Sequence, residues 1–280
     1  MREIAAEAVA RAVREMCIEA NTKLPADVAE CLRIDSRCEP WPIARDALEK
    51  LVENFEIAGR ENVPICQDTG LACVFIDLGQ DVRIVEGGLY EAVNEGVRQG
   101  YGEGYLRKSV VADPLRRRNT GDNTPAHIHV EIAPGDHLAL TVAPKGFGSE
   151  NMGRLAMLPP SAGEGGVKDF VIESVRLAGP NPCPPVVVGV GIGGTFDRVA
   201  LLAKKALLRP LDRPHADPYY ADMERELLER VNALGIGPQG FGGRTTALGV
   251  RIETWPTHIA GLPVAVNLNC HVARHVSRKL

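Results

Sequence analysis

The pattern of hydrophobic and polar positions changes near residue 60. Before that point, apolar residues recur every three or four positions, and residues 2–22 and 41–59 each place them on one face. This spacing predicts helices, so the first 60 residues are expected to be largely helical. After residue 60, short apolar runs alternate with clusters of Gly, Pro, Asn and Asp, which is typical of strands bounded by turns.

Six apolar runs in this second part are predicted strands. They are LACVFIDLG, AHIHVEIA, HLALTVA, PVVVGVGIGG, LGVRIET and LPVAVNLN. Helices are predicted at 86–99, 150–157, 164–177, 194–208 and 217–234. Because strands and helices do not alternate regularly, the expected fold class is mixed α/β (α+β), with a helical N-terminal portion and a multi-lobed body of short strands and helices. The stretch RPLDRPHADP (209–218) is the expected lobe boundary.

Composition narrows the function class. The chain has 280 residues, 32 basic and 36 acidic side chains, a net charge of −4 and only 5% aromatic residues. This balance does not favour nucleic acid or an anionic membrane surface as a partner. No apolar run reaches the roughly 20 residues of a membrane span, and the charged N-terminus does not resemble a signal peptide. We therefore expect a cytoplasmic protein.

Seven cysteines are scattered along the chain, which argues against a disulfide framework in a reducing compartment. Cys66, Cys183 and Cys270 each lie in or beside a turn-rich segment next to an apolar run, and Pro184 follows Cys183. Cysteine in such loops, with proline beside it, is compatible with iron–sulfur ligation. The remaining four are expected to be structural: Cys17, Cys31, Cys38 and Cys73.

Two glycine-rich turns could bind anions. The run VVVGVGIGG fits G-x-G-x-x-G through Gly189, Gly191 and Gly194, with Asp212 at a distance that suits a dinucleotide site. However, Asp212 does not end an apolar strand, so a tight strand-to-helix turn is the favoured interpretation. In KGFGSENMGRLAML, Ser149 is expected to cap a following helix, whose free N–H groups could hold a carboxylate or phosphate.

Taken together, several segments resemble the class I (iron–sulfur) fumarase and L-tartrate dehydratase family, and more narrowly its α-subunit. The resemblance runs from about residue 10 to the end, so residues 1–280 are interpreted as one N-terminal-type catalytic domain of that family. The segments that carry it are PICQDTG, LRKSVV, NTGDNTPAHIH, KGFGSENMGRLAMLPPSAG, GPNPCPPVVVGVGIGG, PTHIAGLPVAV and NLNCH.

The resemblance implies a [4Fe–4S] cluster on three loops. Its ligands would be Cys66, Cys183 and Cys270, which leaves one iron without a cysteine and open to a substrate hydroxyl and carboxylate. The activity implied is reversible hydration of a four-carbon dicarboxylate, fumarate to L-malate, with L(+)-tartrate to oxaloacetate as the alternative. Asp68 would protonate the departing hydroxyl, and His258 would lie near the substrate.

The same resemblance assigns substrate contacts and a partner. Gln67, Arg107 and the backbone N–H of Gly148 would bind the substrate. The family's C3 base lies in a C-terminal-type domain with no counterpart among these segments, so a separate β-subunit and an α2β2 assembly are expected. Three other functions stay open at this point: a non-catalytic iron–sulfur redox sensor, an NAD-dependent oxidoreductase and a structural zinc protein.

Overall fold

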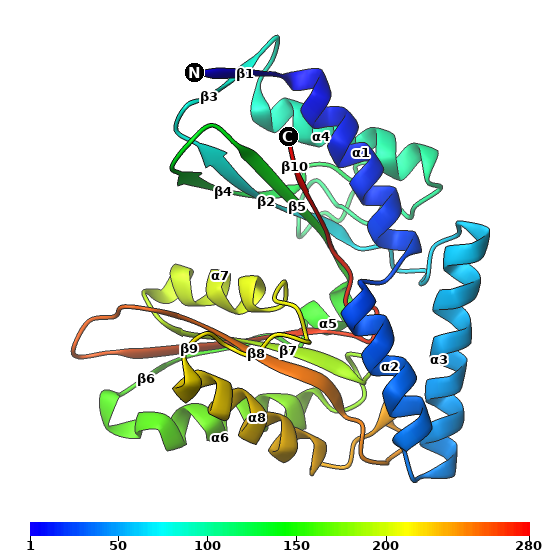
Figure 1. Ribbon diagram of the computed structural model, residues 1–280, viewed down its shortest axis with the longest axis vertical. Coiled ribbons are helices and arrows are strands. Elements are labelled where there is room, and N and C mark those ends of the chain that lie inside the picture. Colours follow the sequence, from blue (N-terminus) through cyan, green and yellow to red (C-terminus); the bar gives the residue numbers. More distant parts are fainter. The chain divides into compact units, whose positions relative to one another are not determined.

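The computed structural model describes residues 1–280 and divides into two compact units (Figure 1). Unit 1 comprises Met1–Pro25, Phe55–Phe147 and Arg274–Leu280, and unit 2 comprises Ala26–Asn54 and Gly148–Ala273. Each unit has its own sheet, covered by helices. The mixed α/β fold class is therefore confirmed.

Unit 1 is built on a sheet with strand order β10-β5-β2-β4. Its strands are β2 (Leu71–Gly79), β4 (His127–Ala133), β5 (Leu138–Lys145) and β10 (Val276–Lys279). Strand β2 pairs in parallel with β4 and antiparallel with β5, which in turn pairs antiparallel with β10. A small parallel pair, β1 (Arg2–Ala5) and β3 (Val82–Val85), lies outside this sheet.

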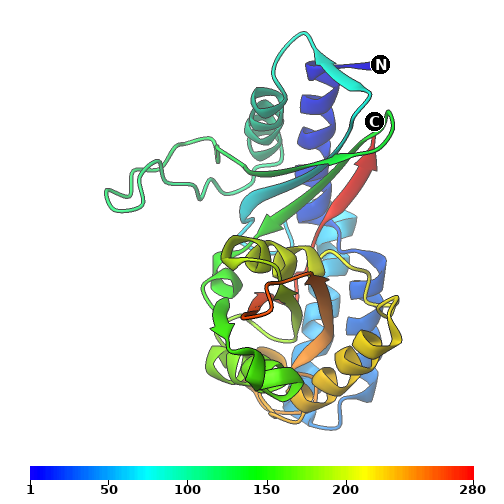
Figure 2. The same cartoon turned by 90° about the vertical axis from the view of Figure 1, so that its left-hand side faces the viewer.

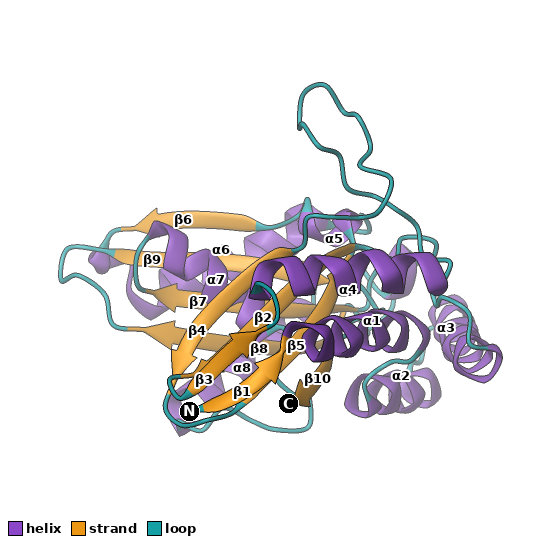
Figure 3. Cartoon of the chain, turned by 90° about the horizontal axis from the view of Figure 1, so that it is seen from above, coloured by secondary structure: helices purple, strands orange, loops and turns teal.

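Two long helices of unit 1 lie side by side across its sheet, α1 (Ala6–Thr22) and α4 (Leu89–Glu103) (Figures 1 and 3). Their apolar faces join the strands in one buried core, in which Met16 and Tyr101 are fully buried. The backbones of the two helices are in direct contact at Gly96, where a Cβ would lie only 2.5 Å from the carbonyl oxygen of Ala10. Glycine is required at such a contact because it has no side chain.

Unit 2 has a second sheet with strand order β6-β9-β7-β8. Its strands are β6 (Arg154–Leu158), β7 (Val186–Gly193), β8 (Ala247–Trp255) and β9 (Leu262–Asn269). Helix α7 (Phe196–Ala206) covers one face of the sheet, and α6 (Gly163–Ala178) and α8 (Pro218–Asn232) cover the other (Figure 1). Helix α2 (Ala26–Cys38) belongs to this unit, and α3 (Pro42–Glu61) runs from unit 2 into unit 1.

The glycine-rich run at β7 serves packing between a strand and a helix. A Cβ on Gly189 or Gly191 would lie 2.2 Å from the carbonyl oxygen of Ala203 or Val199, respectively, on α7. The helix therefore rests directly on the backbone of the strand. Gly194, with φ of +74°, completes the turn into α7. The strand-to-helix interpretation is therefore confirmed.

The predicted strands are all present, whereas the helix predicted at 150–157 is wrong. That segment holds the end of the short helix α5 (Phe147–Glu150), a turn and strand β6. The residues of β6 form the edge of the sheet by antiparallel pairing with β9, and this tertiary pairing overrides local helix propensity. Ser149 therefore lies inside α5 and caps no following helix.

Residues 2–5 form strand β1 rather than the first turn of a helix. The stretch 209–218, predicted to be a lobe boundary, connects α7 and α8 inside unit 2. None of the helices combines the length and the apolar character that a membrane crossing requires.

Candidate functional site

Asp68, in the loop that precedes β2, has both carboxylate oxygens held by backbone N–H groups. The N–H of Gly70 donates to Oδ1 at 3.0 Å, and the N–H of Phe147 donates to Oδ2 at 3.0 Å. A Cβ on Gly146 would lie 3.2 Å from Oδ2, so the backbone that directly follows β5 is in contact with the carboxylate. These two hydrogen bonds fix the orientation of the carboxylate.

Buried side chains secure the residues that follow Asp68. The Thr69 hydroxyl accepts the N–H of Arg107 at 2.9 Å and donates to its carbonyl at 3.2 Å. The phenol of Tyr101 donates toward the carbonyl oxygens of Thr69 and Gly70, each at 2.9 Å. Asn123 donates to the Gly70 carbonyl at 3.2 Å. The loop is therefore tied to the segment that carries Arg107, whose side chain is exposed.

Cys66 and Gln67 occupy the open side of this loop. The Cys66 sulfur accepts the N–H of Asp68 at 3.4 Å, and the thiol lies 3.5 Å from the Gln67 Oε1. Cys66 is half-buried and Gln67 is exposed. The Cys66 side chain therefore lies where a metal could reach it, next to the Asp68 backbone.

Arg274 is a member of this site that the sequence interpretation missed. Its side chain is 4% exposed, and Nη2 donates to the Asp68 carbonyl oxygen. Its Nε and Nη1 are buried without a hydrogen-bond partner. Buried N–H groups without an acceptor are costly, so this position suits an additional acceptor atom beside the Cys66–Asp68 loop. Its place four residues after Cys270 was the available signal.

In unit 2, Cys183 and the Cys270 segment lie next to each other. The exposed Cys183 has φ of +54°, and its carbonyl oxygen accepts the N–H of His271 at 3.3 Å. Gln239 supports this junction, because its backbone N–H and its side-chain Nε2 both donate to the Pro184 carbonyl at 2.8 Å. Cys183 precedes β7 and Cys270 follows β9. Because these two strands are antiparallel, both cysteines lie at the same end of the strands.

The other two predicted site residues of unit 2, Gly148 and His258, lie at opposite ends of the strands of that sheet. Gly148 is exposed in α5, where a Cβ would lie 3.6 Å from the Asn181 carbonyl oxygen, two residues from Cys183. His258 is exposed in the loop between β8 and β9, and its Nδ1 accepts the N–H of Ala260 at 3.1 Å. The length of β9 therefore separates His258 from Cys270, about 25 Å at the usual rise of a strand.

The seven cysteines are all free, and they fall into different chemical environments. Burial raises the pKa of Cys17 to about 12 and that of Cys31 to about 11, so both thiols stay protonated near neutral pH. The structure brings together no three or more His, Cys, Asp and Glu side chains that could hold a metal ion. It joins Cys66 to Asp68 in unit 1, and Cys183 to the Cys270 segment in unit 2.

Comparison with known proteins places these residues in a family. The profile of the fumarate hydratase (Fumerase) family matches residues 10–279. A Methanocaldococcus jannaschii protein provisionally named L(+)-tartrate dehydratase subunit alpha is 42% identical over 274 residues, which are 96% of each chain. The L(+)-tartrate dehydratase subunit alpha of Escherichia coli is 34% identical over 258 residues, which cover 91% of this chain and 84% of that protein. The chain therefore belongs to the class I fumarase and L(+)-tartrate dehydratase α-subunit family, and it is a hydro-lyase.

Proposed function

We propose that this chain is the α-subunit of an iron–sulfur hydro-lyase that hydrates fumarate to L-malate and catalyses the reverse reaction. The observation that carries the proposal is the Cys66–Asp68 loop, where a carboxylate held by two N–H donors stands two residues from an accessible thiol. A proton-transferring carboxylate and a metal ligand on one short, restrained loop suit water addition and removal at a metal.

The residues fit a [4Fe–4S] cluster held by Cys66, Cys183 and Cys270. All three sulfurs lie on loops and none is fully buried, whereas the thiol of Cys17 is buried and protonated. The unsatisfied N–H groups of Arg274 beside the Cys66 loop suit the acceptor atoms of an anionic group. When bound, such a cluster with one iron free of cysteine supplies a Lewis acid for the substrate hydroxyl and carboxylate.

The protein groups would divide the remaining chemistry. In dehydration, Asp68 gives a proton to the hydroxyl as the C2–O bond breaks, and in hydration it takes a proton from the incoming water. The exposed guanidinium of Arg107 presents paired donors to a substrate carboxylate, and Gln67 and the N–H of Gly148 offer further hydrogen bonds. Phe147 and Gly70 hold the Asp68 carboxylate in one orientation throughout.

The distance of His258 from the two cysteines of unit 2 limits the role that it can have. It lies across the sheet of unit 2 from Cys183 and Cys270, about one strand length away. No side chain spans that distance. A role for His258 at the substrate therefore requires that it serve the site of another copy of the chain in the assembly.

A second subunit completes the proposed enzyme. The related proteins from M. jannaschii and E. coli are named as α-subunits, which implies a partner in those proteins. We propose that this chain likewise acts with a β-subunit that supplies the base at C3, in a cytoplasmic α2β2 assembly.

L(+)-tartrate is the second candidate substrate, because the related α-subunits carry that name. The test is to co-express the chain with its β-subunit, reconstitute the complex anaerobically, and measure kcat/KM for L-malate, fumarate and L(+)-tartrate. Higher kcat/KM for malate and fumarate supports the fumarase proposal, and higher kcat/KM for tartrate supports the second candidate. Turnover of none of the three by a fully cluster-loaded complex contradicts both.

A further inference from the structure

An arm formed by residues 109–122 projects from unit 1, away from helices α1 and α4 (Figures 2 and 3). It has its own hydrogen bonds, including Ala112 N–H to the Arg118 carbonyl at 2.8 Å and Thr120 N–H to the Val110 carbonyl at 3.0 Å. At the tip, Asp113 accepts the N–H of Leu115 at 3.0 Å. The arm is therefore shaped in advance, so little ordering would be needed when it binds a partner.

The tip of this arm presents an apolar side chain beside three cations. Leu115 is 90% exposed. The next three residues, Arg116, Arg117 and Arg118, are exposed, and their guanidinium groups form no ion pair within the chain. Three adjacent arginines repel one another unless carboxylates face them. The tip therefore suits an acidic surface with a small apolar recess.

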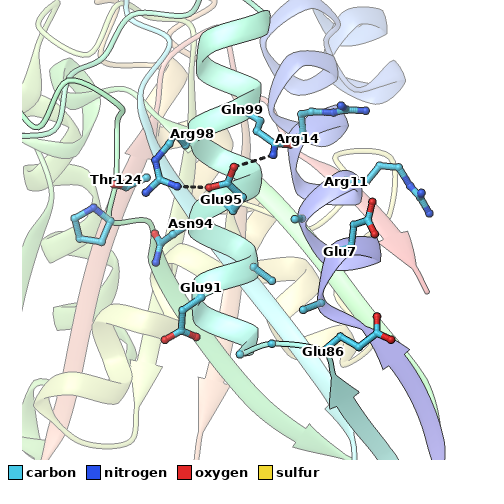
Figure 4. Close-up of a pocket in the computed structure, with 16 residues that line it drawn as sticks. Glu7, Arg11, Arg14, Glu86, Glu91, Asn94, Glu95, Arg98, Gln99 and Thr124 are labelled. Atoms are coloured by element: carbon cyan, nitrogen blue, oxygen red, sulfur yellow. Dashed lines mark hydrogen bonds and ion pairs between the residues drawn. The ribbon is translucent and has the colours of Figure 1, made fainter.

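A groove with those properties lies on the same unit, between α1 and α4 (Figure 4). Its volume is about 920 Å³. Its floor includes the small side chains of Ala10 and Ala92. Its rim carries Glu7, Glu86 and Glu91, which are exposed and form no ion pair, and Figure 4 shows them toward one end of the groove.

The charges at the other end of the groove largely neutralise one another. Arg98 bonds to Glu95 and also to Asp122 at 3.0 Å, and Arg14 lies 3.6 Å from Glu103. Arg11 is the one cation of the lining that has no carboxylate partner. The groove therefore has an acidic end with three unpaired carboxylates and one unpaired cation, Arg11, which Figure 4 shows beside Glu7.

We propose that the arm of one copy of this chain docks in the α1/α4 groove of a second copy. Leu115 packs on the alanine floor, and Arg116–Arg118 face Glu7, Glu86 and Glu91. Because every copy carries both an arm and a groove, two copies can exchange arms reciprocally around a twofold axis, and the contact closes without forming a filament.

The exchange also reaches the candidate site. The first residue of the arm, Ser109, donates its N–H at 2.7 Å to the Oδ1 of Asn123, the residue that directly follows the arm. Asn123 also donates to the Gly70 carbonyl, in the loop of Cys66 and Asp68. An arm held by a second copy would therefore restrain Asn123, whose side chain is bonded to the loop of Cys66 and Asp68.

The first test is the oligomeric state of the full chain by sedimentation velocity over a concentration series. We expect a concentration-dependent dimer that weakens as salt is raised, because exposed ion pairs are screened. The triple variant R116S/R117S/R118S and the triple variant E7Q/E86Q/E91Q should each raise the dimer Kd by about tenfold or more. The control R37S/R45S/R213S removes three exposed arginines of unit 2 that form no ion pair, and it should dimerise like the unchanged chain.

A charge exchange locates the contact. R116E/R117E/R118E and E7R/E86R/E91R should each fail to self-associate, and they should form a mixed dimer when combined. A photo-crosslinking residue at Leu115 should label residues 6–14 or 86–99 of the second copy, which isotope labelling distinguishes from its own. A monomeric unchanged chain, dimerisation unaffected by the arm variant, or a label found only on a co-expressed β-subunit would each overturn the proposal.

Discussion

The two cysteine-bearing regions differ in which groups hold them in place. In unit 1, the Cys66–Asp68 loop is secured by buried groups, with Tyr101 and Arg274 bonded to its carbonyl oxygens and backbone N–H groups bonded to Asp68. In unit 2, Cys183 is exposed, and the bonds at its junction run through Gln239 and His271.

The roles proposed for the two regions would account for this difference. A carboxylate that transfers a proton has to be oriented within a hydrogen-bond length of its target before the reaction begins. A cysteine that only ligates a metal needs to reach it, because the bond to the metal then supplies the restraint. The comparison therefore predicts that changes around Asp68 reduce turnover, whereas changes around Cys183 reduce metal retention or stability.

The largest effect should come from Asp68→Asn. The amide keeps much of the shape of the side chain, but it cannot donate the acid proton and it loses one of the two bonds from backbone N–H groups, so kcat should fall by about 10²–10⁴-fold while the cluster is retained. The measurement is kcat of the reconstituted complex with the visible absorption recorded on the same sample. Asp77→Asn, on the exposed side of β2, is the matched control and should keep normal turnover. Near-normal kcat in Asp68→Asn would remove the acid role.

His258→Asn should lower kcat by about 10²-fold if the histidine handles a proton or orients the substrate. Its distance from Cys270 along β9 predicts that it acts on a neighbouring copy. Mixing the inactive His258→Asn and Asp68→Asn complexes after subunit exchange should then restore activity, because some sites receive both intact residues. If mixed complexes stay as inactive as their parents, His258 does not act across copies.

Arg274→Met tests how far the Cys66–Asp68 loop depends on a buried side chain. Loss of the bond to the Asp68 carbonyl should lower kcat by about tenfold with little change in KM, and Arg274→Lys should recover part of the loss. In unit 2, Gln239→Leu removes the side-chain bond to the Pro184 carbonyl and should reduce stability by about 1 kcal/mol, with kcat per cluster unchanged. Thermal unfolding and kcat per cluster, measured on both variants, separate a loss of turnover from a loss of stability. Equal losses of kcat per cluster in Arg274→Met and Gln239→Leu would contradict the comparison.

The smallest effect concerns Asp35 in α2. Burial, and then the negative charge of Glu39, raise the pKa of the Asp35 carboxyl to about 6 from an ordinary value of 3.8. Between these two values the folded chain keeps a proton that the unfolded chain has lost, so stability falls as pH rises through this window. Asp35→Asn should flatten that dependence and add about 1 kcal/mol at pH 7 after allowance for solvent screening. Chemical denaturation at pH 4, 5, 6 and 7 measures it, and an unchanged slope would contradict the assignment.

Sequence reasoning located the strands well because their signal is local. All six apolar runs predicted as strands form strands. The helix predicted at 150–157 was wrong because β6 exists through pairing with β9, a partner more than a hundred residues away. Helix propensity is a local quantity and carries no information on such a partner.

The candidate site was predictable to a similar extent. The motifs singled out Cys66, Asp68 and Arg107, which the fold brings together through Thr69. Arg274 was not singled out, because an arginine in a polar segment is ordinarily solvated and only the fold shows it to be 4% exposed. Nor does sequence reveal that His258 and Cys270 lie at opposite ends of the strands of one sheet, since that depends on the strand pairing.

The most direct test is anaerobic reconstitution of the chain with iron and sulfide, followed by iron and sulfide analysis, visible absorption and EPR after reduction. Four iron atoms per chain, with an EPR signal that L-malate or fumarate perturbs, is the expected result. Cys66→Ser, Cys183→Ser and Cys270→Ser should each lose the cluster, whereas Cys38→Ser, a change at an exposed cysteine outside the site, should keep it. Cluster loading that is the same in all four variants would contradict the assignment of the three ligands.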